Sequence, residues 1–69
     1  MDEPTRYEFR FAERLSETLQ NAFAGLAPPP TGDERVLYGP VRDQEELAAL
    51  LSRFSSLRLT LLDVHRLPD

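Results

Sequence analysis

The stretch from Val41 to Leu67 constrains the fold most, because it predicts a helix with a defined start followed by an apolar strand. Asp43 lies where a helix N-cap is expected. Glu46 follows at the spacing of a capping box, in which two unpaired backbone N–H groups gain acceptors. Apolar side chains then recur at the i, i+3, i+4, i+7 spacing of a helix face that lies on a core: Leu47, Leu50, Leu51 and Phe54. The pattern predicts a helix that ends at Ser55 and Ser56.

The run from Leu57 to Leu67 alternates apolar and polar side chains at the period of a strand, but the alternation changes phase between Leu61 and Leu62. The leucines up to position 61 fall on one face, whereas Leu62 and Val64 fall on the other. Two explanations remain open. Either a β-bulge re-aims the strand at the change of phase, or the second half of the strand is covered on both faces, with a partner chain as the second cover.

Length and cysteine content bound the remaining predictions. The chain has 69 residues, which predicts a single small α+β domain over residues 1–69. A domain of this size buries only about 60% of its unfolded surface, so self-association would add stability. The absence of cysteine excludes disulfides, thiolate catalysis and cysteine metal sites. Residues 1–4 predict a loose N-terminus, and because no apolar run is long enough to span a bilayer we expect a cytoplasmic protein.

The clearest strand pattern is Thr5–Phe11, where aromatic and charged side chains alternate. The two faces carry Tyr7, Phe9 and Phe11, and Arg6, Glu8 and Arg10. The aromatic face needs a cover, and the charged face is solvated or paired across strands. A shorter helix is predicted over Glu17–Ala24, with Ser16 as its N-cap and Gly25 at the left-handed position that ends it.

Residues 27–34 are predicted to form a Pro/Gly loop or an irregular edge strand, because the prolines at 28–30 donate no hydrogen bonds to a sheet. A further strand is predicted from Arg35 to Tyr38. Both helices connect strands, so they can lie on one face of a mainly antiparallel sheet of three to four strands. These elements predict an α+β fold, a two-layer ferredoxin-like sandwich with two helices on one face and Thr5–Phe11 inside the sheet.

The chain also shows a family resemblance, carried by the opening Tyr7–Phe11, by Leu37–Leu47 with the leucines that follow, and by Leu59–Leu67. In these segments it resembles short, mostly uncharacterised ferredoxin-like (βαββαβ) proteins from GC-rich bacteria. The resemblance implies a ferredoxin-like fold and carries no catalytic residue with it. The chain departs from this pattern at Pro28–Pro30, where such proteins usually have a second strand.

The residues with reactive side chains give little indication of chemistry. His65 is the single histidine, and Asp63 lies on the same strand face, so a carboxylate could orient an imidazole for proton transfer. A nucleophile or a second metal ligand is missing, so we predict no catalytic residue, no metal and no cofactor. Asp63 and His65 are weak candidates for lining a pocket. The net charge of −4 disfavours binding to a phosphate backbone, and hence to nucleic acid.

The sheet face without helices is the expected contact surface. Its interface candidates are Arg6, Arg10, Tyr38, Leu62 and Val64, because an apolar centre surrounded by Tyr and Arg is typical of interfaces. We therefore predict a non-catalytic accessory module that forms a homodimer, or docks another protein, through the open sheet face or a strand edge. The alternative is a small enzyme or small-ligand binder whose pocket forms at a subunit interface, lined by Arg10, Tyr38, Asp63 and His65.

Overall fold

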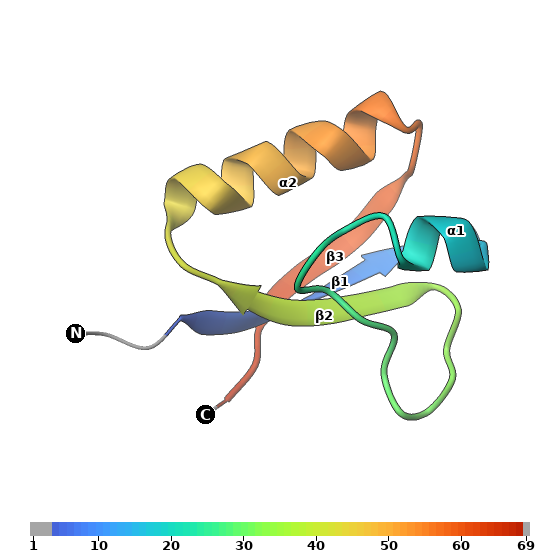
Figure 1. The fold of residues 1–69 in the computed structure, drawn as a ribbon, viewed down its shortest axis with the longest axis horizontal. Coiled ribbons are helices and arrows are strands. Elements are labelled where there is room, and N and C mark those ends of the chain that lie inside the picture. Colours follow the sequence, from blue (N-terminus) through green and yellow to red (C-terminus); the bar gives the residue numbers. More distant parts are fainter. Residues whose placement is uncertain (1–3, 69) are drawn as a thin grey trace.

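The computed structural model describes residues 4–68 as a three-stranded antiparallel sheet with one long and one short helix (Figure 1). The elements in chain order are β1 (Thr5–Phe11), α1 (Glu17–Gln20), β2 (Val36–Val41), α2 (Gln44–Ser56) and β3 (Leu61–Arg66). The strand order is β2-β1-β3, so the prediction that β1 lies inside the sheet is confirmed. The predicted loose N-terminus, residues 1–4, lies outside the described residues except for Pro4.

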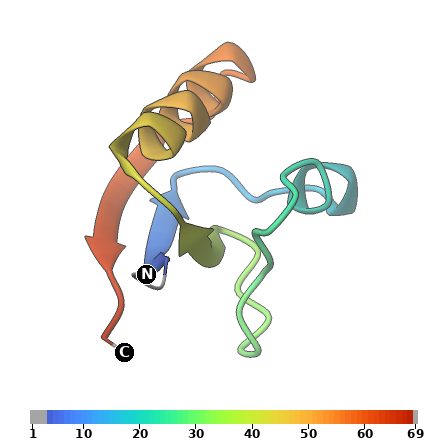
Figure 2. The same ribbon diagram turned by 60° about the vertical axis from the view of Figure 1, so that its left-hand side comes forward.

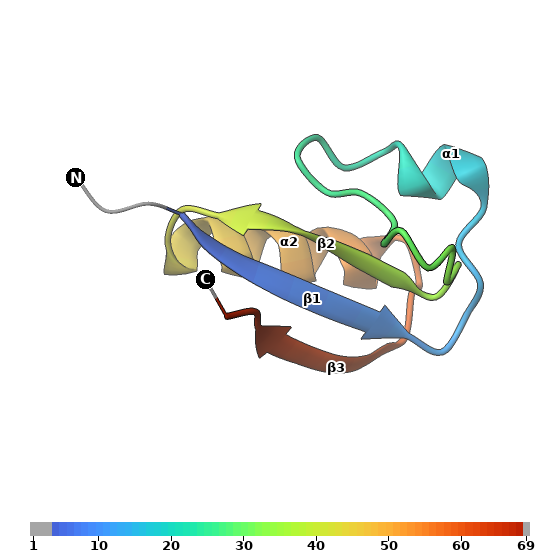
Figure 3. The same ribbon diagram turned by 90° about the horizontal axis from the view of Figure 1, so that it is seen from below.

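The alternation of β1 separates two faces of the sheet. Phe9 and Phe11 are fully buried, and Tyr7 packs half-buried against the same core. Arg6, Glu8 and Arg10 alternate with these aromatics and lie on the face opposite α2, the open face of the sheet. Figure 3 looks onto the open face, with α2 behind the strands.

The long helix α2 begins where its capping residue predicts. The side chain of Asp43 accepts a hydrogen bond from the backbone N–H of Glu46 at 2.8 Å. Only half of the predicted capping box forms, because the carboxylate of Glu46 accepts instead from the backbone N–H and the guanidinium of Arg42, each at 3.3 Å. The three leucines of the predicted stripe are partly buried, and Phe54 is the fully buried residue of the helix.

Phe54 is the centre of an aromatic cluster. Its ring meets those of Phe9, Phe11 and Phe23 edge to face, at centroid distances of 5.2, 5.0 and 4.9 Å. This edge-to-face geometry is the favoured arrangement for aromatic rings and stabilises each pair by about 0.5–1.5 kcal/mol beyond the burial of area. The cluster joins α2 to β1 and to the connection that follows α1.

The first helix is shorter than predicted. Ser16 caps it as expected and accepts from the backbone N–H of Leu19 at 3.2 Å, but α1 ends at Gln20 instead of Ala24. A four-residue helix that buries none of its residues has little to stabilise it. The chain unwinds after it, and in the unwound segment Phe23 reaches Phe54 and Leu26 joins the core.

The topology corrects the ferredoxin-like prediction. The element order is β-α-β-α-β, which lacks the second strand of a βαββαβ fold. In place of that strand, Ala27 alone makes a bridge to Tyr38, with two backbone hydrogen bonds of 2.9 Å. The prolines that follow cannot extend the ladder. Furthermore α1 lies beside β2 (Figure 3), so α2 is the helix that covers the sheet.

A β-bulge at Leu62 explains the change of phase in the last strand. The register to β1 skips this residue, since Arg10 pairs with Asp63 while Phe11 pairs with Leu61. An extra residue of this kind leaves its strand locally unpaired and bent. The bulge explanation, one of the two left open by the sequence, is therefore confirmed.

The bulge also places Val64 on the covered face of the sheet. Val64 pairs with Phe9 and packs partly buried against the core. The prediction that Val64 shares the open face with Leu62 is wrong. Because the register skips Leu62, Leu61 and Val64 both lie on the covered face. Leu62 itself remains 62% exposed.

Replacement of Phe54 tests the aromatic core. We expect Phe54→Ala to lower the free energy of unfolding by about 3–5 kcal/mol, which is a large share of the stability of so small a domain. Phe54→Leu, which keeps more of the volume, should lose less. Urea denaturation followed by circular dichroism measures both changes.

Ser52→Ala on the exposed side of the same helix is the matched control, with an expected change below about 0.5 kcal/mol. A loss at Phe54 no greater than the loss at Ser52 would contradict the assigned core.

Candidate functional site

A row of charged side chains crosses the open face of the sheet. Glu8 lies at its centre, in register with Tyr38 of β2 on one side and His65 of β3 on the other. Arg10, two residues further along β1, pairs with Asp63. The row consists of Asp33, Arg10, Glu8, His65 and Asp63.

Ion pairs and hydrogen bonds connect this charged row. The imidazole of His65 lies between two carboxylates, with Nδ1 at 2.9 Å from Asp63 and Nε2 at 3.7 Å from Glu8. The guanidinium of Arg10 lies 3.4 Å from Glu8 and 4.0 Å from Asp33. Because these groups are partly exposed, each pair contributes only about 0–1 kcal/mol. The row orients side chains more than it stabilises the fold.

The predicted proximity of Asp63 and His65 is present. Both polar contacts of the imidazole within residues 4–68 go to carboxylates, and neither goes to a hydroxyl that could act as a nucleophile. No group of three or more His, Asp or Glu side chains in the described part of the chain is placed to hold a metal ion. The two carboxylates therefore fix the orientation of the His65 ring.

Two of the predicted interface residues contact each other on the open face. The guanidinium of Arg6 lies 5.7 Å from the ring centroid of Tyr38, a cation–π distance. Since Val64 lies on the other face, the open face lacks the apolar centre that the sequence predicted. The charged side chains on this face pair with one another.

A loop that the sequence treated only as a connector forms a wall beside the charged row. Figure 2 shows residues 28–35 on the side of the sheet away from α2. Val36 pairs with Arg10 and so belongs to the open face, yet it is only 3% exposed. A groove of about 540 Å³ lies here, lined by Glu8, Arg10, Pro29, Thr31, Asp33 and Val36. The sequence feature that indicates this wall is the apolar Val36, because it lies in register with the charged residues Arg10 and Asp63.

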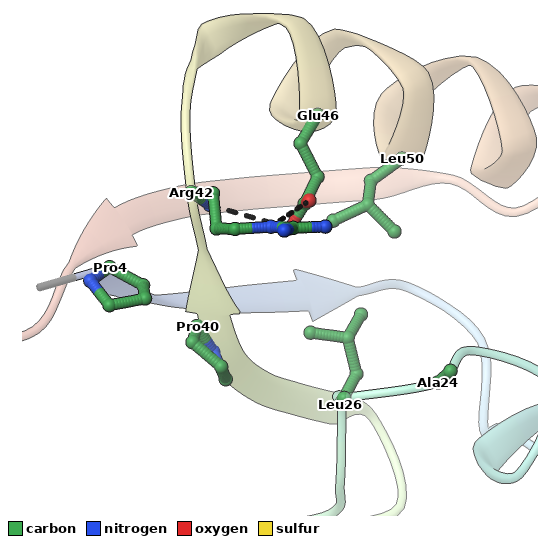
Figure 4. A pocket seen from close by; sticks show the side chains of 8 residues that line it. Pro4, Ala24, Leu26, Pro40, Arg42, Glu46 and Leu50 are labelled. Atoms are coloured by element: carbon green, nitrogen blue, oxygen red, sulfur yellow. Dashed lines mark hydrogen bonds and ion pairs between the residues drawn. The ribbon is translucent and has the colours of Figure 1, made fainter.

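A second hollow lies on the other side of the molecule, between α2 and the end of β2 (Figure 4). It has a volume of about 350 Å³, and the ion pair between Arg42 and Glu46 spans it beside Leu26, Leu50 and Pro40. The pair satisfies its own charges at 3.3 Å. The lining of the hollow is mainly apolar, and its two charged side chains pair with each other.

The two edges of the sheet differ. Along β2, the bridge of Ala27 to Tyr38 occupies the outer edge. Glycine at position 39 permits this approach, because a Cβ there would clash with the carbonyl oxygen of Gly25. Along β3, no described segment pairs with the outer edge. The large hydrophobic side chains that remain exposed in the described chain are Leu62 of β3, at 62%, and Leu57 at the end of α2, at 45%.

Glu13 fixes the start of β3. Its carboxylate accepts a hydrogen bond of 2.8 Å from the backbone N–H of Thr60, and the carbonyl of Thr60 accepts from Ala12 at 2.9 Å. The bonds from the N–H and hydroxyl of Thr60 hold the pKa of the Glu13 carboxyl below its usual value. The contact anchors the chain one residue before β3 begins.

The lowered pKa predicts the sign of a pH effect. Ionised Glu13 stabilises the folded state at a pH above its unfolded pKa, and this contribution is lost as the pH falls through the folded pKa. Glu13→Gln should therefore lower the melting temperature at pH 7, and the difference from the unsubstituted protein should shrink below about pH 4. Thermal unfolding at pH 7, 5 and 3 measures it. An equal difference at pH 7 and pH 3 would contradict this role.

The predicted site residues thus fall into three places. Arg6, Arg10 and Tyr38 lie on the open face, and Asp63 and His65 adjoin them there. Leu62 lies at the free edge, and Val64 lies under α2. The site predictions omitted Glu8, the residue that connects Arg10 to His65. Its position midway along the interior strand is the signal that could have indicated it.

Comparison with known proteins adds a family. The family model described as "Domain of unknown function (DUF8691)" matches residues 6–65, from β1 into β3. No curated protein and no solved structure matches the chain. Within residues 4–68, no helix has the length and apolar character needed to cross a membrane.

Proposed function

We propose that this chain, which belongs to the DUF8691 family of domains of unknown function, is a non-catalytic protein-interaction module of the cytoplasm. It self-associates or docks a partner protein through the free edge of β3 and the adjoining open face. The single observation that carries the proposal is the difference between the two sheet edges. Ala27 occupies the edge of β2, whereas the edge of β3 has no described neighbour.

A free strand edge has its own binding chemistry. Its outward N–H and C=O groups can add a strand from another chain, while side chains on the two faces select that strand. Natural proteins usually protect such edges. The exposure of Leu62 on β3, and of Leu57 just before it, favours coverage by a protein surface, because an exposed apolar side chain gains from burial.

The charged row fits a role in selection. Charges on a contact surface contribute more to specificity and to the rate of encounter than to affinity. Asp63 and His65 lie on the edge strand itself, so they are the first members of the row that an added strand would meet. Arg10 and Arg6, on the interior strand, are already engaged with Glu8 and Tyr38.

Site-specific photo-crosslinking tests the proposal in the cells that produce the protein. A photoreactive amino acid at Leu62 should give an adduct of discrete mass. The same residue at Ala48, which is exposed on α2 away from the sheet, should not. Adducts of the same kind from both positions, or from neither, would contradict the proposal.

The groove beside Arg10 supports one further candidate, a small-ligand binder whose pocket is completed at a subunit interface. A rise in melting temperature with small carboxylic acids or nucleotides, abolished by Arg10→Ala, would favour that function. If the chain is an interaction module alone, the melting temperature of the unsubstituted protein should not change with small carboxylic acids or with nucleotides.

A further inference from the structure

We propose that the partner at the β3 edge is a second copy of this chain, paired antiparallel about a two-fold axis at Val64. This inference rests on the proposed function and names its partner. The result would be a continuous six-stranded sheet with both copies of α2 on one face. The backbone, the charges and the faces of β3 all favour this pairing.

The hydrogen bonds between β3 and β1 determine which backbone N–H and C=O groups of β3 point outward. The N–H of Leu67 donates to the carbonyl of Arg6 at 2.7 Å, so this residue turns its backbone groups toward β1. In an antiparallel ladder the direction alternates from residue to residue. Asp63 and His65 therefore also face β1, and the groups of Val64 and Arg66 face the free edge, while Leu62, which the register skips, makes no pair with β1.

The positions of Asp63 and His65 distinguish the registers that this alternation allows. A two-fold axis at Asp63 would place that carboxylate against its own copy, and an axis at His65 would do the same for the imidazole. An axis at Val64 places Asp63 opposite the partner's His65 and His65 opposite the partner's Asp63. Two carboxylates directly opposite each other destabilise a sheet, whereas a carboxylate opposite an imidazole can accept a hydrogen bond from it, as Asp63 and His65 pair within one chain at 2.9 Å. The sequence of β3 is thus complementary to itself about Val64.

The ends of the strand exclude the two remaining registers. An axis at Leu62 would put the bulge at the centre of the interface. An axis at Arg66 would oppose two guanidinium groups and set Pro68, which has no N–H, against the partner's Val64. Around Val64 the pairing is centred on residues 63–65, between the bulge at Leu62 and Pro68, with Leu62 and Arg66 at its ends.

The two faces of β3 also match across the axis, so that each face of one sheet continues the same face of the other. Asp63 and His65 lie on the open face in both copies, so their new pairs extend the charged row across the axis. Val64 and Arg66 pair with Phe9 and Tyr7 and lie on the covered face. The exposed Leu62 would lie opposite the partner's Arg66, whose aliphatic stem can cover it.

Single cysteines test this register, because the natural chain contains none. Val64→Cys places each thiol opposite its own copy, with Cα atoms about 5.5 Å apart, within the range for a disulfide. Under mild oxidation this variant should become a linked dimer. Leu62→Cys alone and Arg66→Cys alone should not, but their mixture should give the linked heterodimer. The mixture of Leu62→Cys and Arg66→Cys is the control for any disturbance of the core by Val64→Cys, since positions 62 and 66 are both exposed.

An equilibrium measurement uses the same pairing. Leu62→Arg places a guanidinium opposite the partner's Arg66 at both ends of the interface, and should weaken the dimer about tenfold. Adding Arg66→Glu to that variant should restore it. Light scattering over a range of concentrations, with circular dichroism to verify folding, measures both changes.

The outcomes separate this inference from the proposed function. Linked dimers of Leu62→Cys alone in preference to Val64→Cys would overturn the register. A monomer at all concentrations, with no linked dimer of any variant, would overturn self-association. If photo-crosslinking at Leu62 then gives an adduct with a different protein, the interaction module stands and the second copy falls. If it gives none, both fall.

Discussion

The packing of Phe54 against three other phenylalanine rings determines how the chain can be arranged. These rings come from β1 and from the connection after α1, so one side chain of α2 joins its helix to two other segments. A chain of 69 residues without cysteine has no covalent link to replace this contact. With one long helix over the sheet, the burial that stabilises the fold is concentrated where that helix crosses β1.

This concentration explains what is left uncovered. One helix covers one face of three strands, so the opposite face carries charged side chains that pair with one another in the absence of a cover. The connection between β1 and β2 is drawn toward Phe54 by Phe23, and in passing it places Ala27 on the edge of β2. The edge of β3 has no such segment, because α2 leads into it directly through a short turn. The free edge is therefore a consequence of how the core is assembled.

The elements that could be predicted from the sequence are those that local interactions decide. The alternation of Thr5–Phe11 and the cap at Asp43 specify β1 and the start of α2, and both are present as predicted. The length of α1 could not be predicted, since it depends on Phe23, which packs against Phe54 from an unwound segment, while α1 itself has no fully buried residue. Glu46 has the spacing of a capping box but binds Arg42, a choice between two nearby donors that spacing alone cannot decide.

The same distinction applies to the candidate site. The proximity of Asp63 and His65 follows from their two-residue spacing and is present. The face of Val64 depends on the bulge, and near the bulge Thr60 forms hydrogen bonds with Ala12 and Glu13, which are far away in the sequence. A pattern read along one strand cannot contain that information. Its change of phase did indicate the position of the irregularity.

The features that interrupt β3 also explain how a free edge can be selective. Bulges, charged side chains and prolines are the usual protection of an edge strand against indiscriminate pairing, and β3 has a bulge at Leu62, charges from Asp63 to Arg66 and Pro68 after its end. These features shorten the edge but leave it open. Because Asp63 and His65 sit two positions apart on one face, an added strand meets an acidic group and an imidazole in fixed order. A strand in the wrong register brings like groups together, and this repulsion contributes as much to specificity as the favourable pairs do.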